Sequence, residues 1–184
     1  MPILTDAMTY EELLTYPNDG LRREIHEGEL VVAPSPDWRH QRSGGRFAFE
    51  VRLHLRARGL PDNVFEAPLD LRLTPHNVYQ PDVIYIGPER RHLLGDKMPI
   101  DGAPDLVAEV LSPSTRTYDQ REKARVYARA GIREYWVLDP ENRTIEVYEL
   151  VGGEYVLVPP VAGRAVSRVL PGFSVDPNPL FADL

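Results

Sequence analysis

The stretch Asp105–Tyr127, DLVAEVLSPSTRTYDQREKARVY, decides the fold of this chain. Its first part, Asp105–Leu111, is a nearly continuous apolar run with valines at positions of both parities. Such a run is typical of a strand that is buried on both faces. Glu109 lies in the middle of the run. A lone carboxylate in that setting costs several kcal/mol unless it is paired, protonated or bound to a cation.

A helix is predicted to follow this strand. Pro113 ends the strand, and Thr117 with Gln120 has the spacing of a capping box. The helix is expected to run to about Ala130, because Gly131 is a typical residue just after a helix C-terminus.

Lys123 is the residue of this helix that matters most for chemistry. With Tyr127 and Ala130 it falls on one side of the helix, so we expect it beside the face that meets the sheet. There its ammonium group could reach Glu109. An ordinary pair with Asp119, one turn earlier, is the competing interpretation.

The rest of the chain reads as a mixture of hairpins and helices. The predicted elements are a helix at Tyr10–Thr15, a hairpin at Arg22–Pro34, a helix from about Arg39 or Ser43 to Arg58, strands Phe65–Leu73 and Val83–Ile86 paired as a hairpin, a polar connection at Glu89–Gly102, a strand at Glu134–Leu138, a hairpin of Arg143–Leu150 with Glu154–Val158, and an extended edge from Leu170. The crossover over residues 105–138 implies at least one parallel pair in a mixed sheet. We therefore expect a mixed α/β (α+β) fold with a central mixed sheet flanked by helices. Residues 1–184 would form one domain, with a core at about 20–140 and a C-terminal hairpin and tail at 141–184.

Composition excludes several classes of protein. The chain has no cysteine, which excludes disulfides, thiolate zinc sites and a cysteine nucleophile. No apolar run approaches about 18 residues, so no membrane span is expected. The N-terminus lacks the basic and apolar regions of a signal peptide, and we expect a cytoplasmic protein. The motifs of zincins, α/β-hydrolases and Rossmann enzymes are all missing from the sequence.

Asp82 is the candidate partner for Glu109. It follows Pro81 at the start of a predicted strand, and it would lie near Glu109 if the two strands are neighbours. Two close carboxylates repel each other unless a divalent cation neutralises them. Oxygen ligands beside a lysine favour Mg²⁺ or Mn²⁺ over zinc. Such an ion can bind a phosphodiester oxygen, and Lys123 would stabilise transition-state charge or orient the attacking water.

Each of these acids also has a purely structural interpretation. Aspartate after proline is common at a strand entrance, and Glu109 could simply pair with an arginine of the following helix.

Local basic segments offer candidate contacts to a phosphate backbone, although the net charge is −7. Residues 39–58 are mostly basic in their charges and include the candidates His40, Arg42 and Arg46. Arg121 begins a stripe with Arg125 and Arg129 on the later helix. The alternative for all of them is an ordinary solvated helix face.

Several of these segments together resemble a bacterial family of restriction endonuclease-like proteins of unknown biological role, within the PD-(D/E)XK nuclease superfamily. The residues that carry the resemblance are Pro81-Asp82, Glu109–Thr115, Lys123, Tyr127, Gly131–Asp139 and Arg23–Leu30. The resemblance covers most of residues 10–150. It implies a helix–hairpin–strand–helix–strand core.

The resemblance also implies roles for particular residues. The acidic metal ligands fall on Asp82 and Glu109, with the backbone carbonyl of Val110 as a further ligand. The glutamate that the superfamily carries on a helix would be Glu24, although the sequence around it predicts a strand.

One position departs from the superfamily pattern. The superfamily lysine should occupy position 111, where this chain has Leu111. The resembling family moves the lysine onto the next helix, which fits Lys123.

Together these features predict a Mg²⁺- or Mn²⁺-dependent endonuclease that hydrolyses DNA, and a homodimer by analogy with small nucleases. Two alternatives remain open. One is a catalytically silent module that keeps the nuclease-like fold to bind DNA or protein, which the acidic net charge favours. The other is a metal-dependent hydrolase of a small phosphorylated substrate, favoured if the cleft is too narrow for duplex DNA.

Overall fold

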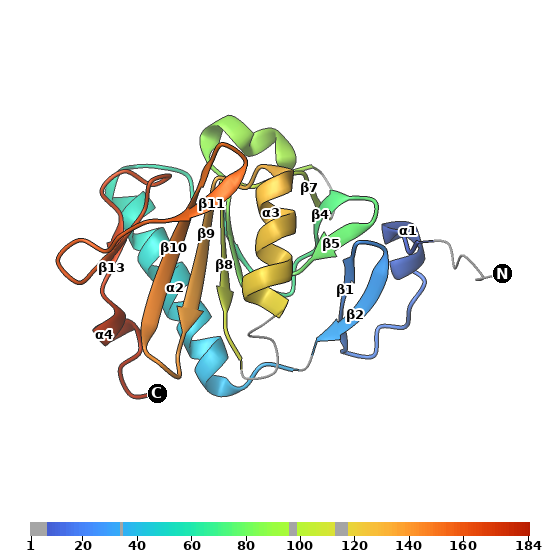
Figure 1. Cartoon of the computed structure of the whole chain (residues 1–184), viewed down its shortest axis with the longest axis horizontal. Helices are drawn as coiled ribbons and strands as arrows, with labels where there is room; N and C mark the ends of the chain where they lie inside the picture. Colours follow the sequence, from blue (N-terminus) through green and yellow to red (C-terminus); the bar gives the residue numbers. More distant parts are fainter. Residues whose placement is uncertain (1–6, 34, 96–98, 113–117) are drawn as a thin grey trace.

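Two mixed β-sheets organise the chain (Figure 1). The computed structural model describes residues 7–33, 35–95, 99–112 and 118–184. The six-stranded sheet has the order β11 (Glu154–Leu157), β10 (Thr144–Val151), β9 (Glu134–Asp139), β8 (Leu106–Val110), β6 (Val83–Tyr85) and β3 (Val64–Glu66). Strands β8 and β9 are parallel and the other pairs of this sheet are antiparallel, which confirms the predicted parallel crossover.

The second sheet has five strands and was not anticipated. Its order is β2 (Glu29–Ala33), β1 (Arg22–His26), β5 (Asn77–Tyr79), β4 (Leu71–Thr74) and β7 (Ile100–Asp101), with only β4 and β7 parallel. A small separate sheet pairs β12 (Ala165–Val166) with β13 (Ser174–Val175). The mixed α/β class and a central mixed sheet are therefore confirmed, and the five-stranded sheet that contains the predicted N-terminal hairpin is an addition.

The extra sheet arises where the sequence predicted one strand over Phe65–Leu73. That segment forms β3 and β4, which belong to different sheets. Pro68 lies between them and has no N–H group to donate, so the hydrogen-bond ladder cannot continue through it. The predicted pairing with residues 83–86 holds only for β3, where Phe65 faces Ile84.

The helices are α1 (Tyr10–Leu13), α2 (Trp38–Ala57), α3 (Ala124–Ala130) and α4 (Pro177–Leu180), with a 3₁₀ turn η1 (Pro88–Leu93) and a π-helical turn η2 (Tyr118–Lys123) leading into α3. Helix α2 begins at Trp38 because the Asp37 side chain accepts a hydrogen bond from the His40 N–H. Gly131 ends α3 with φ 88°, as predicted. The proposed cap at Thr117 lies outside the described residues.

The six-stranded sheet is covered on both faces. Alternate residues of β8 point in opposite directions, so Ala108 and Val110 join the cluster under α2, whereas Val107 packs on the side of α3. Figure 1 shows the two helices on opposite sides of this sheet. Glu109 has the parity of Val107 and therefore points toward α3.

The C-terminal tail packs onto α2 instead of forming the predicted extended edge. Phe173 lies 6.2 Å from the ring of Phe47 and 5.7 Å from Trp136, between ring centroids. Leu170 and Phe181 are buried in the same cluster. Within the described ranges, no helix is both long and apolar enough to cross a membrane.

Candidate active site

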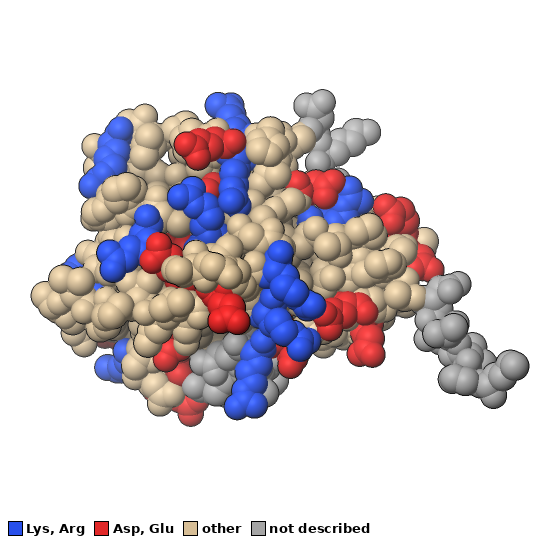
Figure 2. All heavy atoms as spheres, turned by 45° about the horizontal axis from the view of Figure 1, so that its top comes forward, with Lys and Arg blue, Asp and Glu red and all other residues tan. Residues whose placement is uncertain are grey.

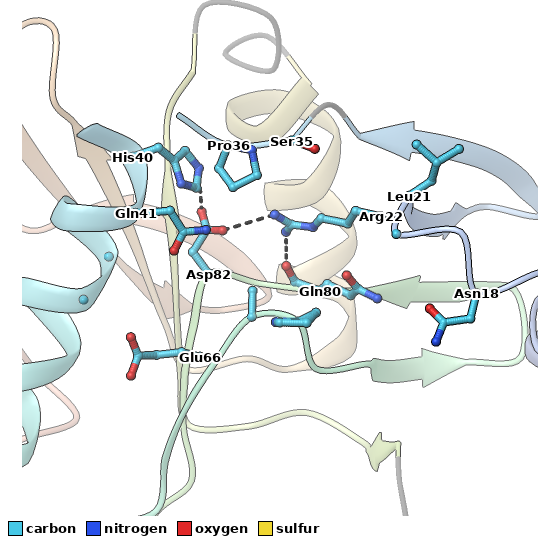
Figure 3. A pocket seen from close by; sticks show the side chains of 15 residues that line it. Asn18, Leu21, Arg22, Ser35, Pro36, His40, Gln41, Glu66, Gln80 and Asp82 are labelled. Carbon is cyan, nitrogen blue, oxygen red and sulfur yellow. Dashed lines mark hydrogen bonds and ion pairs between the residues drawn. The ribbon is translucent and has the colours of Figure 1, made fainter. Parts of the chain in front are cut away.

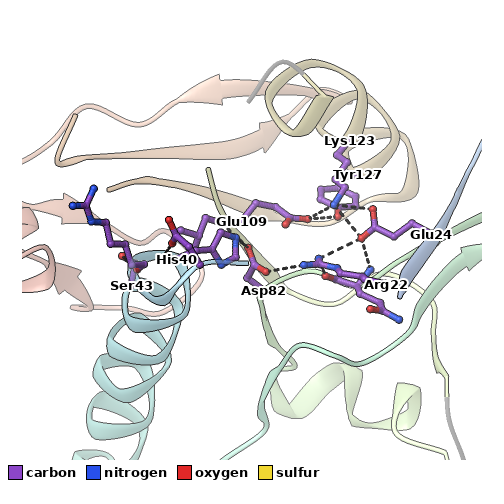
Figure 4. A network of polar contacts seen from close by, with 12 residues as sticks. Arg22, Glu24, His40, Ser43, Asp82, Glu109, Lys123 and Tyr127 are labelled. Atoms are coloured by element: carbon purple, nitrogen blue, oxygen red, sulfur yellow. Dashed lines mark hydrogen bonds and ion pairs between the residues drawn. The ribbon is translucent and has the colours of Figure 1, made fainter. Parts of the chain in front are cut away.

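Three buried carboxylates meet where the two sheets join (Figure 4). Glu24 comes from β1, Asp82 directly precedes β6, and Glu109 lies on β8. Their exposed fractions are 1%, 8% and 2%. Because Val83 is in register with Ala108, Asp82 comes beside Glu109, as the sequence predicted for neighbouring strands.

Lys123 connects two of these acids. Its Nζ atom lies 3.0 Å from Glu24 Oε2 and 3.1 Å from Glu109 Oε1, and the residue is 3% exposed. Tyr127, one helical turn later, donates a hydrogen bond of 2.7 Å to Glu109 Oε1. Lys123 thus faces the sheet as predicted. The structural interpretation of Glu109 paired it with an arginine of the following helix, and the structure pairs it with Lys123. The competing pair with Asp119 involves a side chain outside the described part.

Arg22 is a member of the cluster that the sequence did not reveal. Its Nη1 lies 3.2 Å from Asp82 Oδ1 and its Nη2 lies 3.3 Å from Glu24 Oε1. The guanidinium also donates to the carbonyl oxygen of Gln80. Arg22 Nε is buried without a hydrogen-bond partner among the described residues. The available signal was strand alternation, which puts Arg22 on the same face of β1 as Glu24.

Asp82 is held by two further groups. His40 Nε2, from the first turn of α2, lies 3.2 Å from Asp82 Oδ2. The backbone N–H of Val110 donates a 2.8 Å hydrogen bond to the same oxygen. The family resemblance implies a metal-binding carbonyl at Val110, and the contact that the structure gives this residue at the site is the hydrogen bond from its N–H to Asp82.

The electrostatics of the cluster favour the ionised forms of Asp82 and Glu24. Burial alone would raise the pKa of Asp82, but His40, Arg22 and the Val110 N–H together hold this pKa below its ordinary value. Burial would likewise raise the pKa of Glu24, and the charges of Lys123 and Arg22 lower it.

The buried carboxylates also raise the pKa values of the neighbouring Arg22 and Tyr127. Burial works against the charge of Arg22, yet Glu24 and Asp82 raise its pKa above the ordinary value. Burial, followed by the charge of Glu109, raises the pKa of Tyr127. Tyr127 therefore acts as a hydrogen-bond donor at neutral pH.

The donor set fits a hard divalent cation by its chemistry. Its ligand atoms are carboxylate oxygens, which Mg²⁺ and Mn²⁺ prefer. Asp82 and Glu109 are the acids that would hold the ion. Across the described residues, no group of three His, Asp or Glu side chains is arranged to hold a metal. Arg22 contacts Asp82, and Lys123 contacts Glu109. A bound ion would compete with these cations for the two acids.

A pocket of about 360 Å³ opens onto one side of the cluster (Figure 3). Arg22, His40 and Asp82 line it and point toward one another, whereas Glu109 and Lys123 are buried outside its lining. Of the three clustered acids, Asp82 is the one that lines the pocket. The remaining wall combines small and apolar residues with five polar side chains, Asn18, Ser35, Gln41, Glu66 and Gln80.

Two of the other predicted substrate contacts lie elsewhere. Arg42 donates to the Asp183 carbonyl at 3.1 Å, and Arg46 donates to the Leu180 carbonyl at 2.9 Å. Both arginines thus fasten the C-terminal tail to α2, so the structure does not bring them to the acids.

Arg121 is exposed on η2. The two arginines that continue its stripe, Arg125 and Arg129, form ion pairs with Glu27. Figure 2 shows basic side chains interspersed with acidic ones over one face of the molecule, without a broad basic surface. This face therefore gives no strong electrostatic footprint for a nucleic acid.

Glu24 lies on strand β1, as the sequence around it predicted, and not on a helix as in the superfamily pattern. The position nevertheless reaches the cluster through the five-stranded sheet. Gln80, at the crossing from β5 to β6, donates its backbone N–H to Glu24 Oε1 at 2.9 Å. The same short connection from β5 to β6 also places Asp82 in the cluster.

Comparison with known proteins agrees with this fold. A family model described as "Uma2: Putative restriction endonuclease" matches residues 10–178. A solved structure of "a putative nuclease belonging to DUF820" from Anabaena variabilis ATCC 29413 is similar with a TM-score of 0.75 and 20% sequence identity, over 95% of this chain and 97% of that chain. At this identity the likeness establishes the fold alone. None of the curated proteins compared with the chain matches it.

Proposed function

The chain belongs to the Uma2 family of "putative restriction endonuclease" proteins, and from this premise we propose that it is a metal-dependent endonuclease that hydrolyses DNA phosphodiester bonds. The observation that carries the proposal is the convergence of three buried carboxylates with the buried Lys123 beside a pocket. Stability alone does not explain these buried charges, because replacing buried ion pairs by apolar side chains is often neutral or stabilising. Perturbed acids beside a cavity are typical of functional sites.

Asp82 and Glu109 would hold Mg²⁺ or Mn²⁺, with the Val110 carbonyl as a further ligand. When bound, such an ion supplies charge neutralisation at a phosphodiester and a more acidic bound water. The resemblance to the PD-(D/E)XK superfamily supports the same assignment.

Lys123 would stabilise the negative charge that develops on the phosphoryl oxygens. Its ammonium group is held in place by Glu24 on one side and by Glu109 on the other, at 3.0 and 3.1 Å. A cation fixed in this way needs little reorganisation when charge develops nearby. Glu24 would therefore act mainly by orienting Lys123, and Tyr127 by orienting Glu109 through its hydrogen bond.

His40 would contact a substrate phosphate at the pocket mouth. It lines the pocket, is 12% exposed in its side chain, and lies against Asp82. Arg22 lines the same wall of the pocket. When a metal displaces its guanidinium from Asp82, Arg22 would contact the substrate phosphate instead. Arg121 is proposed as a more distant contact to the DNA phosphate backbone. Arg42 and Arg46 would contact the DNA only after they are released from the C-terminal tail.

The direct test is plasmid cleavage by the purified protein with Mg²⁺ or Mn²⁺, with a chelator as the negative control. We expect nicking or linearisation that Glu109→Ala abolishes. Glu122→Ala is the matched control, because Glu122 is a glutamate on η2 next to Lys123, with a half-exposed side chain paired to Arg125. Cleavage that persists in Glu109→Ala at the wild-type rate would refute the site.

A catalytically silent binding module is the second candidate. The observation that favours it is the charge balance of the cluster, in which Arg22, Lys123 and His40 already contact all three carboxylates. A silent module would bind DNA with and without Mg²⁺ and leave the plasmid intact. The nuclease would cleave it only with the metal.

A further inference from the structure

The outer face of α2 is more apolar than a solvated helix face needs to be. The inner face buries Phe47, Val51 and Leu55 completely. On the outer face Phe49 is 60% exposed and Leu53 is 51% exposed. Clustered exposed apolar side chains of this kind mark interaction surfaces in soluble proteins.

The shape of this face combines a ridge with hollows. Phe49 stands between two surface hollows of about 360 and 520 Å³ and contributes to the lining of both. The larger hollow is formed by the later part of α2 and the turn after it, with Leu53, Arg56 and Leu60 among its lining residues. A protruding aromatic ring beside a hollow that contains two leucines is an arrangement that two copies of one surface can share.

The charges of the face are self-complementary. Glu50 and Arg56 are both exposed and lie three residues before and three residues after Leu53. Neither forms an ion pair within the described part of the chain. The neighbouring Arg52, in contrast, already pairs with Asp62 and Glu66.

We propose that this face is the contact between two copies of the chain, with the two α2 helices antiparallel about a two-fold axis at Leu53. The symmetry places Glu50 opposite the partner's Arg56, and Arg56 opposite the partner's Glu50. Phe49 of each copy enters the hollow beside Leu53 and Leu60 of the other. A dissimilar partner would not require opposite charges at equal distances from one central residue, so a second copy explains the pattern best. This contact is independent of the proposed nuclease activity.

Charge reversal tests the proposal on the full-length protein. Sedimentation equilibrium should give a dimer of the 20.9 kDa chain. Glu50→Arg or Arg56→Glu alone should raise the dissociation constant by at least about tenfold, because each creates like-charge pairs across the axis. The double variant should return to within about threefold of the wild type. Leu53→Arg should give a monomer.

Leu157→Arg is the matched control, since Leu157 is 52% exposed on β11 and should leave the dimer unchanged. Circular dichroism checks that each variant is folded; all substituted side chains are exposed. A wild-type monomer, a dimer that resists the single reversals, or a double variant that does not recover would each overturn the proposal.

Discussion

Two buried glutamates on neighbouring parallel strands differ in the charge of the groups around them. Glu109 lies near the end of β8 and Glu134 at the start of β9, and their exposed fractions are 2% and 0%. Glu134 accepts hydrogen bonds of 2.7 Å from Trp136 Nε1 and from Ser167 Oγ. The backbone N–H groups of Arg168 and Val169 donate to its second oxygen. These four donors are all neutral groups.

Glu109 has a cationic partner and lies among other acids. Lys123 and Tyr127 contact its Oε1, and Lys123 also contacts Glu24. Gathering like charges in a buried place costs free energy that neutral donors avoid, unless cations offset it. The difference teaches that burial of a carboxylate does not by itself mark a functional site. The grouping of acids with cations beside a pocket is the informative feature.

The sharpest way to break this comparison is the same substitution at both glutamates. Glu109→Gln should lower plasmid cleavage by about a thousandfold or more, because loss of several kcal/mol of metal and charge stabilisation costs about tenfold per 1.4 kcal/mol. Glu134→Gln should leave the activity per folded molecule within about twofold of the wild type. Equal losses of activity in the two variants would show that the distinction between the two sites is wrong.

The loss of unfolding free energy should be larger at Glu134 than at Glu109, which is the reverse of the order expected for activity. Glu134→Ala leaves Trp136 Nε1, Ser167 Oγ and the Arg168 N–H without this acceptor, and should cost about 3 kcal/mol of unfolding free energy. Glu109→Gln should cost less than about 1 kcal/mol, since Lys123 keeps Glu24 and repulsion among the acids falls. Urea unfolding of both variants measures this. A larger loss in Glu109→Gln would contradict the assignment of Glu134 as the structural acid.

Arg22 sharpens the comparison through metal affinity. Arg22→Met removes a cation that competes for Asp82 and Glu24, so the Mn²⁺ dissociation constant should fall by about tenfold in calorimetric titration. Arg23→Met is the matched control, because the neighbouring Arg23 pairs with Asp19 instead. An unchanged Mn²⁺ affinity in Arg22→Met would mean that Arg22 does not occupy the metal position.

The smallest expected effect is on the pH dependence of stability. The pKa of Glu24 is lowered in the folded protein, by Lys123 and Arg22 against the effect of burial. A lowered folded pKa contributes stability that is present above the ordinary carboxyl pKa and is lost as pH falls through the folded value. Glu24→Gln should therefore show a shallower loss of unfolding free energy than the wild type between about pH 6 and pH 3. Parallel curves would contradict ionisation of Glu24 in the fold.

The segment from β8 to β9 could be predicted from the sequence because its signals are local. Apolar parity defined the strand with Glu109, and helical spacing put Lys123 and Tyr127 on the face toward it. Glycine at position 131 fixed the end of α3. The meeting of Asp82 with Glu109 followed once neighbouring strands were assumed.

The rest depended on contacts that are distant in sequence. Nothing local shows that β3 and β4 join different sheets, nor that Arg22 on β1 reaches Asp82 at 3.2 Å across a separation of 60 residues. The tail looked like an edge because its prolines disfavour regular strands, yet its Phe173 and Phe181 supply core side chains for α2. Burial of those rings is decided by tertiary packing.

The central claim is that the acids around Lys123 form a metal site. A crystal soaked in Mn²⁺ and measured for anomalous scattering tests it most directly. We predict a single anomalous peak between the carboxylates of Asp82 and Glu109, with the Arg22 guanidinium displaced from Asp82. A crystal at saturating Mn²⁺ without a peak there, and with Arg22 still on Asp82 and Glu24, would contradict the claim.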